Sequence, residues 1–333
     1  MIRTFEDIVN GQPLDGELGA LLAEVKAPTN FFKRAIYDDA MTRADNTGVS
    51  LVKRVNMLGA NKREVGVNGK TSNAKKDKYA IIADSYNAGY GADIATLRKA
   101  SLGGDTTDLD IDEESALLSV LLCTINGLMH SARKENSGSD GYDGFITLAK
   151  ANKCEFAKAE NAPIVLSDPA DLELFLGFLD SATSRIKQYS TAPAISSHYS
   201  ILEYFTSMAR KYPNLNIGSV NDFGSQVTAY NGVPLDNLGA WFTLNGDGQT
   251  IDSAEIIPIR EDGTTDVVIY GFGSRCAKID YEYEDFVLHE SPSIVTGNEV
   301  KRGFFEFRGC LNPKIDTCCY VIKNVRILPV VGA

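Results

Sequence analysis

The acidic residues with the most suggestive spacing are Asp280, Glu282, Glu284 and Asp285, which crowd one short segment. If that segment is a strand, alternate residues share a face, and two carboxylates on one face could perform the acid and base steps of glycoside hydrolysis. That chemistry depends on the distance between the carboxyl groups, which the sequence does not give. The segment fits a hydrolytic, carbohydrate-active enzyme on a β-rich domain or, as we favour, an acidic and solvated sheet face.

The histidines and short motifs give no metal or cofactor site. His130, His198 and His289 lack the H-x-x-H and H-E-x-x-H spacings of zinc enzymes. The sequence also lacks the phosphate-binding loop G-x-x-x-x-G-K-S/T, a complete dinucleotide fingerprint and the nucleophile turn G-x-S-x-G. We therefore expect a protein that is not an enzyme and that needs no cofactor and no metal.

The cysteines also argue against a metal site. They contain no C-x-x-C pair and fall on apolar or strand-like stretches, so neither a zinc ribbon nor a secreted disulfide framework is indicated. Free cysteine behaves as a small hydrophobic residue, and we expect six buried thiols. They are Cys123, Cys154, Cys276, Cys310, Cys318 and Cys319.

The composition is that of a globular protein. The chain has 333 residues, 44% of them hydrophobic and 23% charged, with a net charge of -11, and its length suits roughly two domains. No apolar run approaches the about 18 residues that span a bilayer, and the first residues lack the basic start and apolar stretch of a secretory signal. We expect no membrane role and a protein that stays in the cytoplasm where it is made.

One segment departs from this acidic background, because residues 53–78 contain eight basic residues and two acids. Such a run fits a solvated loop, a nucleic-acid-binding segment, or a projecting hairpin that lies across an acidic neighbour. The single aromatic residue at its end, Tyr79, argues against stacking on single-stranded bases, so we favour the hairpin. Its basic residues are Lys53, Arg54, Lys62, Arg63, Lys70, Lys75, Lys76 and Lys78.

The strongest helix signal lies in residues 105–135, where leucines recur at steps of three and four. Asp108, Asp110 and Asp112 alternate like the opening of a calcium loop, but Glu113 stands where that loop requires glycine. Acids at a helix start are favoured by the helix dipole. These residues therefore predict the start of a helix and no calcium site.

Three further helices are predicted. A short one over residues 14–25 lies in an arm that covers residues 1–45. A second begins at Asp168 as N-cap and Pro169 at the first helical position, with an apolar stripe that continues to Ile186. A third spans residues 199–211.

Strand patterns dominate the C-terminal part of the chain. Asn231 and Gly232 supply the positive φ angles of a tight hairpin turn, and residues 245–249 form another turn. Pro234 cannot donate to a ladder, so we expect it at a sheet edge or a strand start, at a rim that another subunit can cover. The predicted strands are Val49–Val55, Val220–Tyr230, Glu255–Ile259, Val267–Phe272, Lys278–Tyr283, Gly303–Arg308 and Cys319–Leu328.

The order of these features resembles the major capsid proteins of tailed bacteriophages, which have the HK-ninety-seven-type fold. Four segments carry the resemblance: Gly141–Ile146 after the long helix, Leu166–Leu176 at the head of a helix, the helix of residues 199–211, and Phe223–Leu235. The resemblance implies an α+β fold with five parts. These are an N-terminal arm (1–45), an E-loop hairpin (46–90), a peripheral domain (91–160) with a spine helix at about 110–134, an axial domain (161–300), and C-terminal strands (301–333) that return to the main body.

By the same resemblance, the chain would assemble in the host cytoplasm into hexamers and pentamers and form the icosahedral virion shell around double-stranded DNA. The net charge of -11 suits a wall that encloses DNA without gripping it. The resemblance also implies portal and decoration proteins as partners. A separate scaffolding protein is expected, because the sequence has no long, charged N-terminal extension of the kind that some relatives cleave.

Overall fold

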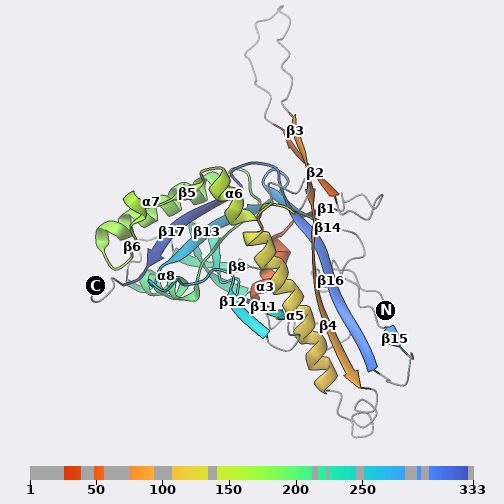
Figure 1. The fold of residues 1–333 in the computed structure, drawn as a ribbon. Helices are drawn as coiled ribbons and strands as arrows, with labels where there is room; N and C mark the ends of the chain where they lie inside the picture. The colour runs from red at the N-terminus through yellow and green to blue at the C-terminus, as the bar shows by residue number, and fades with distance from the viewer. Residues whose placement is uncertain are drawn as a thin grey trace, which may run out of the picture.

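The computed structural model describes residues 26–38, 49–55, 76–93, 107–133, 141–211, 217–222, 225–244, 251–281, 291–293 and 300–328. It confirms a mixed helix and sheet fold (Figure 1). The elements in chain order are α3 (Lys26–Arg34), β1 (Tyr37–Asp38), β2 (Val49–Val55), β3 (Lys76–Ile82), β4 (Asp84–Asp93), α5 (Thr107–His130), α6 (Phe145–Ala151), β5 (Glu155–Phe156), η2 (Ala159–Asn161), β6 (Ile164–Val165), α7 (Pro169–Ile186), β7 (Ala192–Ser196), α8 (Tyr199–Lys211), β8 (Ile217–Asp222), β9 (Ser225–Tyr230), β10 (Val233–Asp236), β11 (Ala240–Leu244), β12 (Ile251–Glu255), β13 (Thr265–Phe272), β14 (Ala277–Tyr281), β15 (Ser291–Ser293), β16 (Val300–Pro313) and β17 (Cys319–Arg326).

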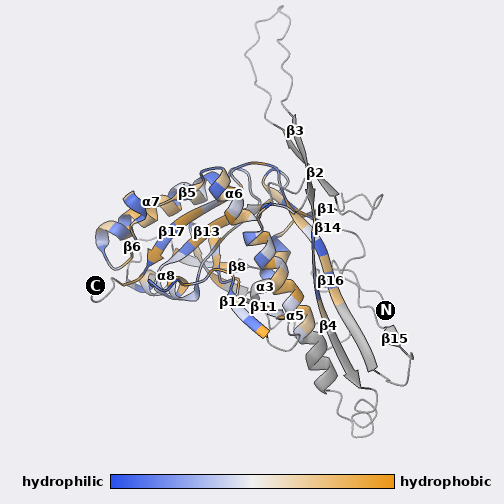
Figure 2. Cartoon of the chain, viewed as in Figure 1, coloured by the Kyte–Doolittle hydropathy of each residue, from blue (hydrophilic) through white to orange (hydrophobic). Residues whose placement is uncertain are grey.

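An eight-stranded sheet forms the compact lobe of the molecule. Its strand order is β5-β17-β13-β7-β10-β9-β8, and β6 also pairs with β17. β13 is buried over almost its whole length, with β17 on one side and β7 on the other, both antiparallel. The helices α6 and α7 pack against these central strands, and Figure 2 shows hydrophobic residues along β13 and β17. This sheet therefore forms the core of the lobe.

An aromatic cluster ties three distant segments together in this core. The ring of Phe31 in α3 lies 5.6 Å from that of Tyr270 and 5.4 Å from that of Phe272, both in β13. Phe145 of α6 lies 5.2 Å and 5.4 Å from the same two rings. All four side chains are fully buried, so α3 is part of the core.

The second, elongated part of the molecule is built on β4 and β16. These strands pair antiparallel from Asp84 opposite Gly309 to Asp93 opposite Val300, and β14 and β15 also pair with β16. The helix α5 packs along both β4 and β16. Figure 1 shows the long helix beside these strands, next to the compact lobe.

The helix predicted from the leucine steps is α5. Leu117, Leu121 and Ile125 are at most 3% exposed, which confirms the apolar stripe. The helix ends at His130, four residues before the expected end. The carbonyl of the following residue, Ser131, bonds to the segment that leads into α6. The N–H of Gly144 donates to the carbonyl of Ser131 at 2.7 Å. No helix in the described part of the chain is long and apolar enough to cross a membrane.

The predicted start of α7 is confirmed. Pro169 is its first residue, and the Asp168 carboxylate accepts the N–H of Ala170 at 3.0 Å. The third predicted helix, residues 199–211, is α8. The predicted helix of residues 14–25 lies outside the described residues.

The hairpin turn at Asn231 and Gly232 is confirmed, with φ angles of 50° and 73°. One expectation near it is wrong, and a second is confirmed only in part. Residues 220–230 are parts of two strands, β8 and β9, which pair antiparallel up to Asp222 opposite Ser225; alternation alone does not mark the reversal. Pro234 stands at the start of its strand, as one of the two expected positions, and the pairing of β10 with β7 begins one residue later, at Leu235. The expected rim is not found there, because β10 lies between β7 and β9.

The strand predicted over residues 255–259 is also misplaced. β12 ends at Glu255, and Pro258, which cannot donate to a ladder, lies in the loop that follows. The strand β4 was missed, because residues 84–93 contain Gly89, Gly91 and few large hydrophobic residues. It becomes a strand through its long-range pairing with β16.

Candidate functional site

The basic hairpin predicted from residues 53–78 falls on an antiparallel two-stranded ribbon. β2 and β3 pair from Val49 opposite Ile82 to Val55 opposite Lys76, and we call this pair the β2–β3 ribbon. It projects from the top of the molecule in Figure 1. Of the predicted contact residues, Lys53 and Arg54 lie on β2 and Lys76 and Lys78 on β3, whereas Lys62, Arg63, Lys70 and Lys75 lie outside the described residues.

The register of this ribbon leaves basic residues opposite one another. Lys53 is paired with Lys78, and Arg54 is paired with Asp77. Like charges directly opposite in a sheet are destabilising, and a two-stranded hairpin is marginally stable without further strands or packing. Its own strand pairing therefore stabilises the β2–β3 ribbon only weakly.

A second ribbon, which the sequence reasoning identified only as a hairpin turn, has an uncovered apolar face. β11 and β12 pair from Ala240 opposite Glu255 to Leu244 opposite Ile251; we call them the β11–β12 ribbon. Phe242, Leu244 and Ile251 are 40%, 64% and 66% exposed. The alternation of Phe242 and Leu244 before an Asn-Gly turn is the signal that could have identified it.

Two histidines contact residues at the C-terminal end of β12. His130 donates its Nε2 proton to the carbonyl of Ile256 at 2.6 Å. The N–H of Ser200 donates to Nδ1 of His198 at 3.2 Å, so Nε2 of His198 carries a proton and faces the Glu255 carboxylate at 3.0 Å. Both histidines thus have structural roles, as hydrogen-bond partners of residues 255 and 256.

A buried ion pair fixes α3 to the eight-stranded sheet. Nη1 of Arg34 contacts Oδ2 of Asp236, and the Ser196 hydroxyl donates to Oδ1 of the same carboxylate at 2.5 Å. Arg34 is 3% exposed and Ser196 is fully buried. Because a buried charge is costly without its partner, this pair locks α3, β7 and β10 into one arrangement.

A tyrosine pair joins the elongated part to the compact lobe. The hydroxyls of Tyr86 on β4 and Tyr142 before α6 lie 3.0 Å apart. Burial raises the pKa of Tyr86 to about 12, and burial together with Tyr86 raises the pKa of Tyr142. A Cβ atom at Gly127 of α5 would lie 1.8 Å from the Tyr86 hydroxyl. Glycine is therefore required where α5 passes the Tyr86 side chain of β4.

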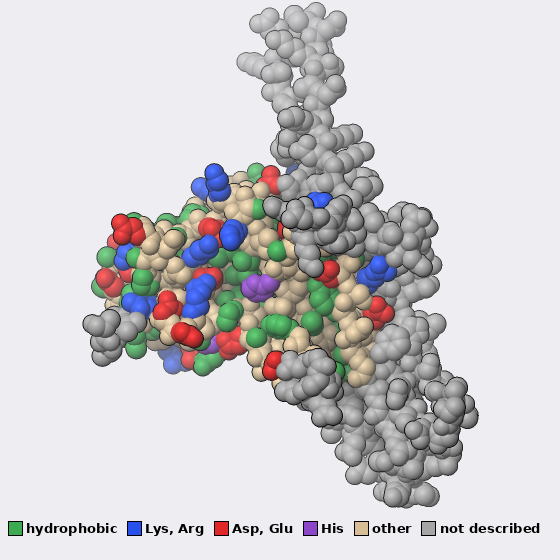
Figure 3. Space-filling view, viewed as in Figure 1, with side chains coloured by type: hydrophobic (Ala, Val, Ile, Leu, Met, Phe, Trp, Pro, Cys, Tyr) green, Lys and Arg blue, Asp and Glu red, His purple; other side chains and the backbone are tan. Residues whose placement is uncertain are grey.

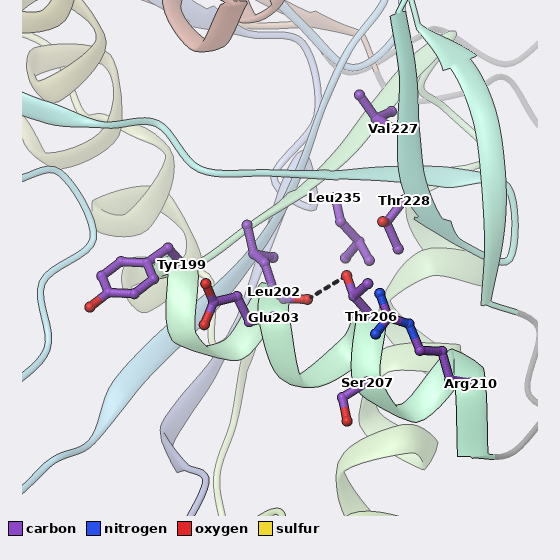
Figure 4. A pocket seen from close by; sticks show the side chains of 9 residues that line it. All are labelled: Tyr199, Leu202, Glu203, Thr206, Ser207, Arg210, Val227, Thr228 and Leu235. Carbon is purple, nitrogen blue, oxygen red and sulfur yellow. Dashed lines mark hydrogen bonds between the residues drawn. The ribbon is translucent and has the colours of Figure 1, made fainter.

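An open groove runs beside α8 (Figure 4). It encloses about 500 Å³ and is lined by residues of α8, β9 and β10, among them Leu202, Arg210, Thr228 and Leu235. The Thr206 hydroxyl donates to the carbonyl of Leu202 at 3.1 Å and so makes a helix hydrogen bond. The sequence does not predict this groove.

Of the acids that suggested a hydrolase, the one that the structure describes, Asp280, is not solvated. Asp280 is fully buried, and the Asn312 side chain donates to its Oδ2. Glu282, Glu284 and Asp285 lie outside the described residues. The expectation of an acidic, solvated sheet face is therefore wrong at Asp280, because β14 is covered on both faces there, and a buried carboxylate does not meet a substrate.

The cysteines are free thiols, as predicted. Five of the six are buried and Cys123 is partly buried. Burial raises the pKa of Cys276 to about 12 and raises that of Cys319 as well. Raised pKa values keep these thiols protonated and unreactive. Among the described residues, no group of three or more histidines, cysteines and acids could hold a metal ion.

The visible surface of the compact lobe carries no large field of one sign. Figure 3 shows acidic and basic side chains interspersed over the lobe that contains α7 and α8. Nucleic-acid binding depends on clustered lysine and arginine.

Comparison with known proteins shows the fold. The chain is similar to a protein of the holo-SrpI encapsulin complex of Synechococcus elongatus, with 13% identity, 93% of this chain and 92% of that chain covered, and a TM-score of 0.55. It is also similar to a structure of Gordonia phage Cozz, with 13% identity, coverages of 89% and 86%, and a TM-score of 0.51. A third similar structure is the capsid of the empty GTA particle, with 12% identity, coverages of 90% and 91%, and a TM-score of 0.50.

No family profile and no curated protein matches the sequence. The structural similarities extend over nearly the whole chain, so they describe its complete architecture rather than one motif. The chain has the HK-ninety-seven-type fold of phage capsids and encapsulins. The fold that the sequence resemblance implied is confirmed.

Proposed function

We propose that this chain is the major capsid protein of a tailed bacteriophage and self-assembles through hexamers and pentamers into the icosahedral head around double-stranded DNA. The observation that carries the proposal is the shared fold over nearly the whole chain, in structures of a phage and of a particle capsid. The two ribbons support the proposal, because contact with a neighbouring copy would stabilise each of them. The β2–β3 ribbon has one pair of like charges opposite each other, and the β11–β12 ribbon has an uncovered apolar face.

In this proposal the parts of the chain take the roles that the resemblance implied. The β2–β3 ribbon is part of the E-loop (46–90), and its basic residues contact a neighbouring subunit. Residues 1–45 form the N-terminal arm, 91–160 the peripheral domain, 161–300 the axial domain, and 301–333 the C-terminal strands. Scaffolding, portal and decoration proteins would be partners during assembly in the host cytoplasm and in the virion.

The similarity to the encapsulin complex favours a second candidate, a shell of the encapsulin type. The two candidates share self-assembly and differ in contents. Particles from the natural source that protect double-stranded DNA from nuclease support the phage capsid, and particles that contain no DNA at any stage support the encapsulin type. In either case the chain is a structural protein, and the groove and buried Asp280 give no support to the hydrolase alternative.

The purified full-length chain tests the proposal. We expect sedimentation velocity and negative-stain electron microscopy to show closed particles many times larger than the 36.1 kDa subunit. A variant in which residues 56–75 are replaced by a short Gly-Ser linker should form few particles or none, since it shortens the E-loop. A wild-type chain that stays a monomer or small oligomer at every concentration and salt condition, alone and with its scaffolding protein, would refute the proposal.

A further inference from the structure

The strand β8 forms one edge of the eight-stranded sheet. It pairs with β9 on one side, and no strand in the described part of the chain pairs with its other side. The opposite edge of the sheet is formed by β5 and β6, which have two residues each, whereas β8 has six. An edge of this length presents backbone N–H and C=O groups that can pair with a further strand.

The hairpin of β9 and β10 fixes the direction of the backbone groups in the neighbouring strand β8. Tyr230 and Val233 flank its two-residue turn and are paired, which makes them a hydrogen-bonded pair. Successive residues of an antiparallel strand bond to opposite sides, so Ala229 bonds towards β8. Pro234, which has no N–H, stands opposite Ala229 in β10, as this direction requires. Ala229 therefore bonds to its partner in β8, Gly218.

The outward backbone groups of β8 belong to alternate residues. Since the backbone of Gly218 points to β9, the N–H and C=O groups of Ile217, Ser219 and Asn221 point away from the sheet. The strand contains no proline, lysine or arginine, residues that block pairing at many sheet edges. This edge is therefore open to a strand that runs beside it.

A space beside Gly218 can receive a side chain of that further strand. A Cβ atom at Gly218 would have no neighbour within 4 Å, and both Gly218 and Ser219 are exposed. An open depression of about 580 Å³ lies here, lined by residues 217–220 and by Ala229, Asn231 and Gly232. Glycine in a strand has no side chain of its own to pack, so a fitting strand has an apolar residue opposite Gly218.

A second copy of β8 is such a strand. When two copies run antiparallel with Ser219 opposite Ser219, Gly218 of each copy stands opposite Val220 of the other. Directly opposite residues share a face of the sheet, so Val220 enters the space beside Gly218 at two symmetric places. Like charges do not meet along this pair, because the one charged residue of β8, Asp222, lies beyond the paired stretch of residues 217–221.

We propose that two copies of this chain pair through β8, antiparallel and about a twofold axis at Ser219, so that their two sheets join. Each pair of outward residues then exchanges two backbone hydrogen bonds. The contact is isologous, because each copy offers the same edge, and it covers both edges at once. The inference goes beyond the proposed function, since head-to-tail contacts around a ring of subunits do not require a twofold pair.

Disulfide formation at the twofold axis tests this contact. Ser219→Cys places two cysteines opposite each other with Cα atoms about 5.5 Å apart, which suits a disulfide. The purified full-length variant, with subunits and particles kept together, should form a covalent dimer under mild oxidation, seen on a non-reducing gel. The matched control is Ser207→Cys, at an exposed serine of α8. We expect at least tenfold more dimer from Ser219→Cys than from Ser207→Cys.

A second cross-link and a proline test the register. Gly218→Cys/Val220→Cys should also form the dimer, and Gly218→Cys alone should form at least tenfold less, because residue 218 stands opposite residue 220. Adding Ser219→Pro to the double variant removes an outward N–H and keeps the groups that bond to β9, so it should lower the dimer yield about tenfold.

Equal dimer yields from Ser219→Cys and Ser207→Cys, or no loss on adding Ser219→Pro, would overturn the inference and leave the proposed function intact. A wild-type chain that forms no particles while Ser219→Cys still forms the dimer would overturn the proposed function alone.

Discussion

The eight-stranded sheet and the two projecting ribbons use the same kinds of residues in opposite ways. In the sheet, β13 is covered by β7, β17 and α7, so its Val, Ile, Tyr and Phe side chains are buried within one subunit. In the β11–β12 ribbon, Leu244 and Ile251 remain about two-thirds exposed. The difference fits the proposed function, in which the sheet stabilises the subunit and the ribbons meet neighbouring copies.

The largest effect on subunit stability is expected from Phe272→Ala. Phe272 is fully buried between the rings of Phe31 and Phe145, and truncation of such a side chain costs about 3–5 kcal/mol. Urea denaturation followed by circular dichroism measures the loss. The matched control is Phe242→Ala, at 40% exposure, which should destabilise the free subunit by only about 1 kcal/mol and yet reduce particle yield. Equal losses in the free subunit would break the comparison.

The buried ion pair should give the next largest effect. Asp236→Ala removes the carboxylate that faces Arg34 and leaves a buried guanidinium without its anion, at a cost of about 3 kcal/mol. The same denaturation experiment applies, with the exposed acid Asp252→Ala as control. If Asp236→Ala were as stable as wild type, α3 would not depend on this pair for its position.

The tyrosine pair predicts a loss of stability at alkaline pH. The folded-state pKa of Tyr86 is about 12, above the usual value of about 10. The neutral Tyr86 hydroxyl therefore contributes fully to the free energy of unfolding below pH 10, and this contribution declines as the pH rises toward 12. The loss over that interval is on the order of 2 kcal/mol. Tyr86→Phe should reduce the alkaline loss of stability, while the exposed Tyr199→Phe should leave it unchanged. An alkaline loss that is identical in all three proteins would contradict the assignment.

The smallest effect belongs to the cap of α7. Asp168→Ala removes the acceptor for the N–H of Ala170 and should lower the free energy of unfolding by about 1 kcal/mol. Glu173→Ala, an exposed position on the same helix, should change it by less than about 0.5 kcal/mol. Thermal unfolding separates the two, and particle yield should be the same for both variants if the cap serves the subunit alone. A cap variant that unfolds like the control would show that the N-cap bond contributes nothing measurable.

The sequence predicted local elements better than long-range pairings. The start of α7 at Pro169 follows from the cap and proline chemistry of a few adjacent residues, and the turn at Asn231 follows from the preference for positive φ. The strand β4 could not be recognised, because its pairing with residues more than 200 positions later makes it a strand. The reversal between β8 and β9 was missed for a related reason, since the same alternation continues through both strands.

The candidate site was predictable to a similar degree. The charge run from Lys53 to Lys78 identified the basic ribbon, because an excess of charge is visible without knowledge of contacts. The apolar face at Leu244 and Ile251 was not identified, because hydrophobic residues in a hairpin are buried more often than not, and only the structure shows which face is covered. The burial of Asp280 was hidden for the same reason.

Hydrogen exchange compared between dissociated subunits and assembled particles tests the central claim most directly. We predict that backbone amides of the β2–β3 and β11–β12 ribbons exchange quickly in the free subunit and become at least tenfold slower in the particle. Amides of β13 and β17 should exchange slowly and equally in both states. Ribbons that are as well protected in the free subunit as in the particle would contradict the claim that copies of this chain complete each other.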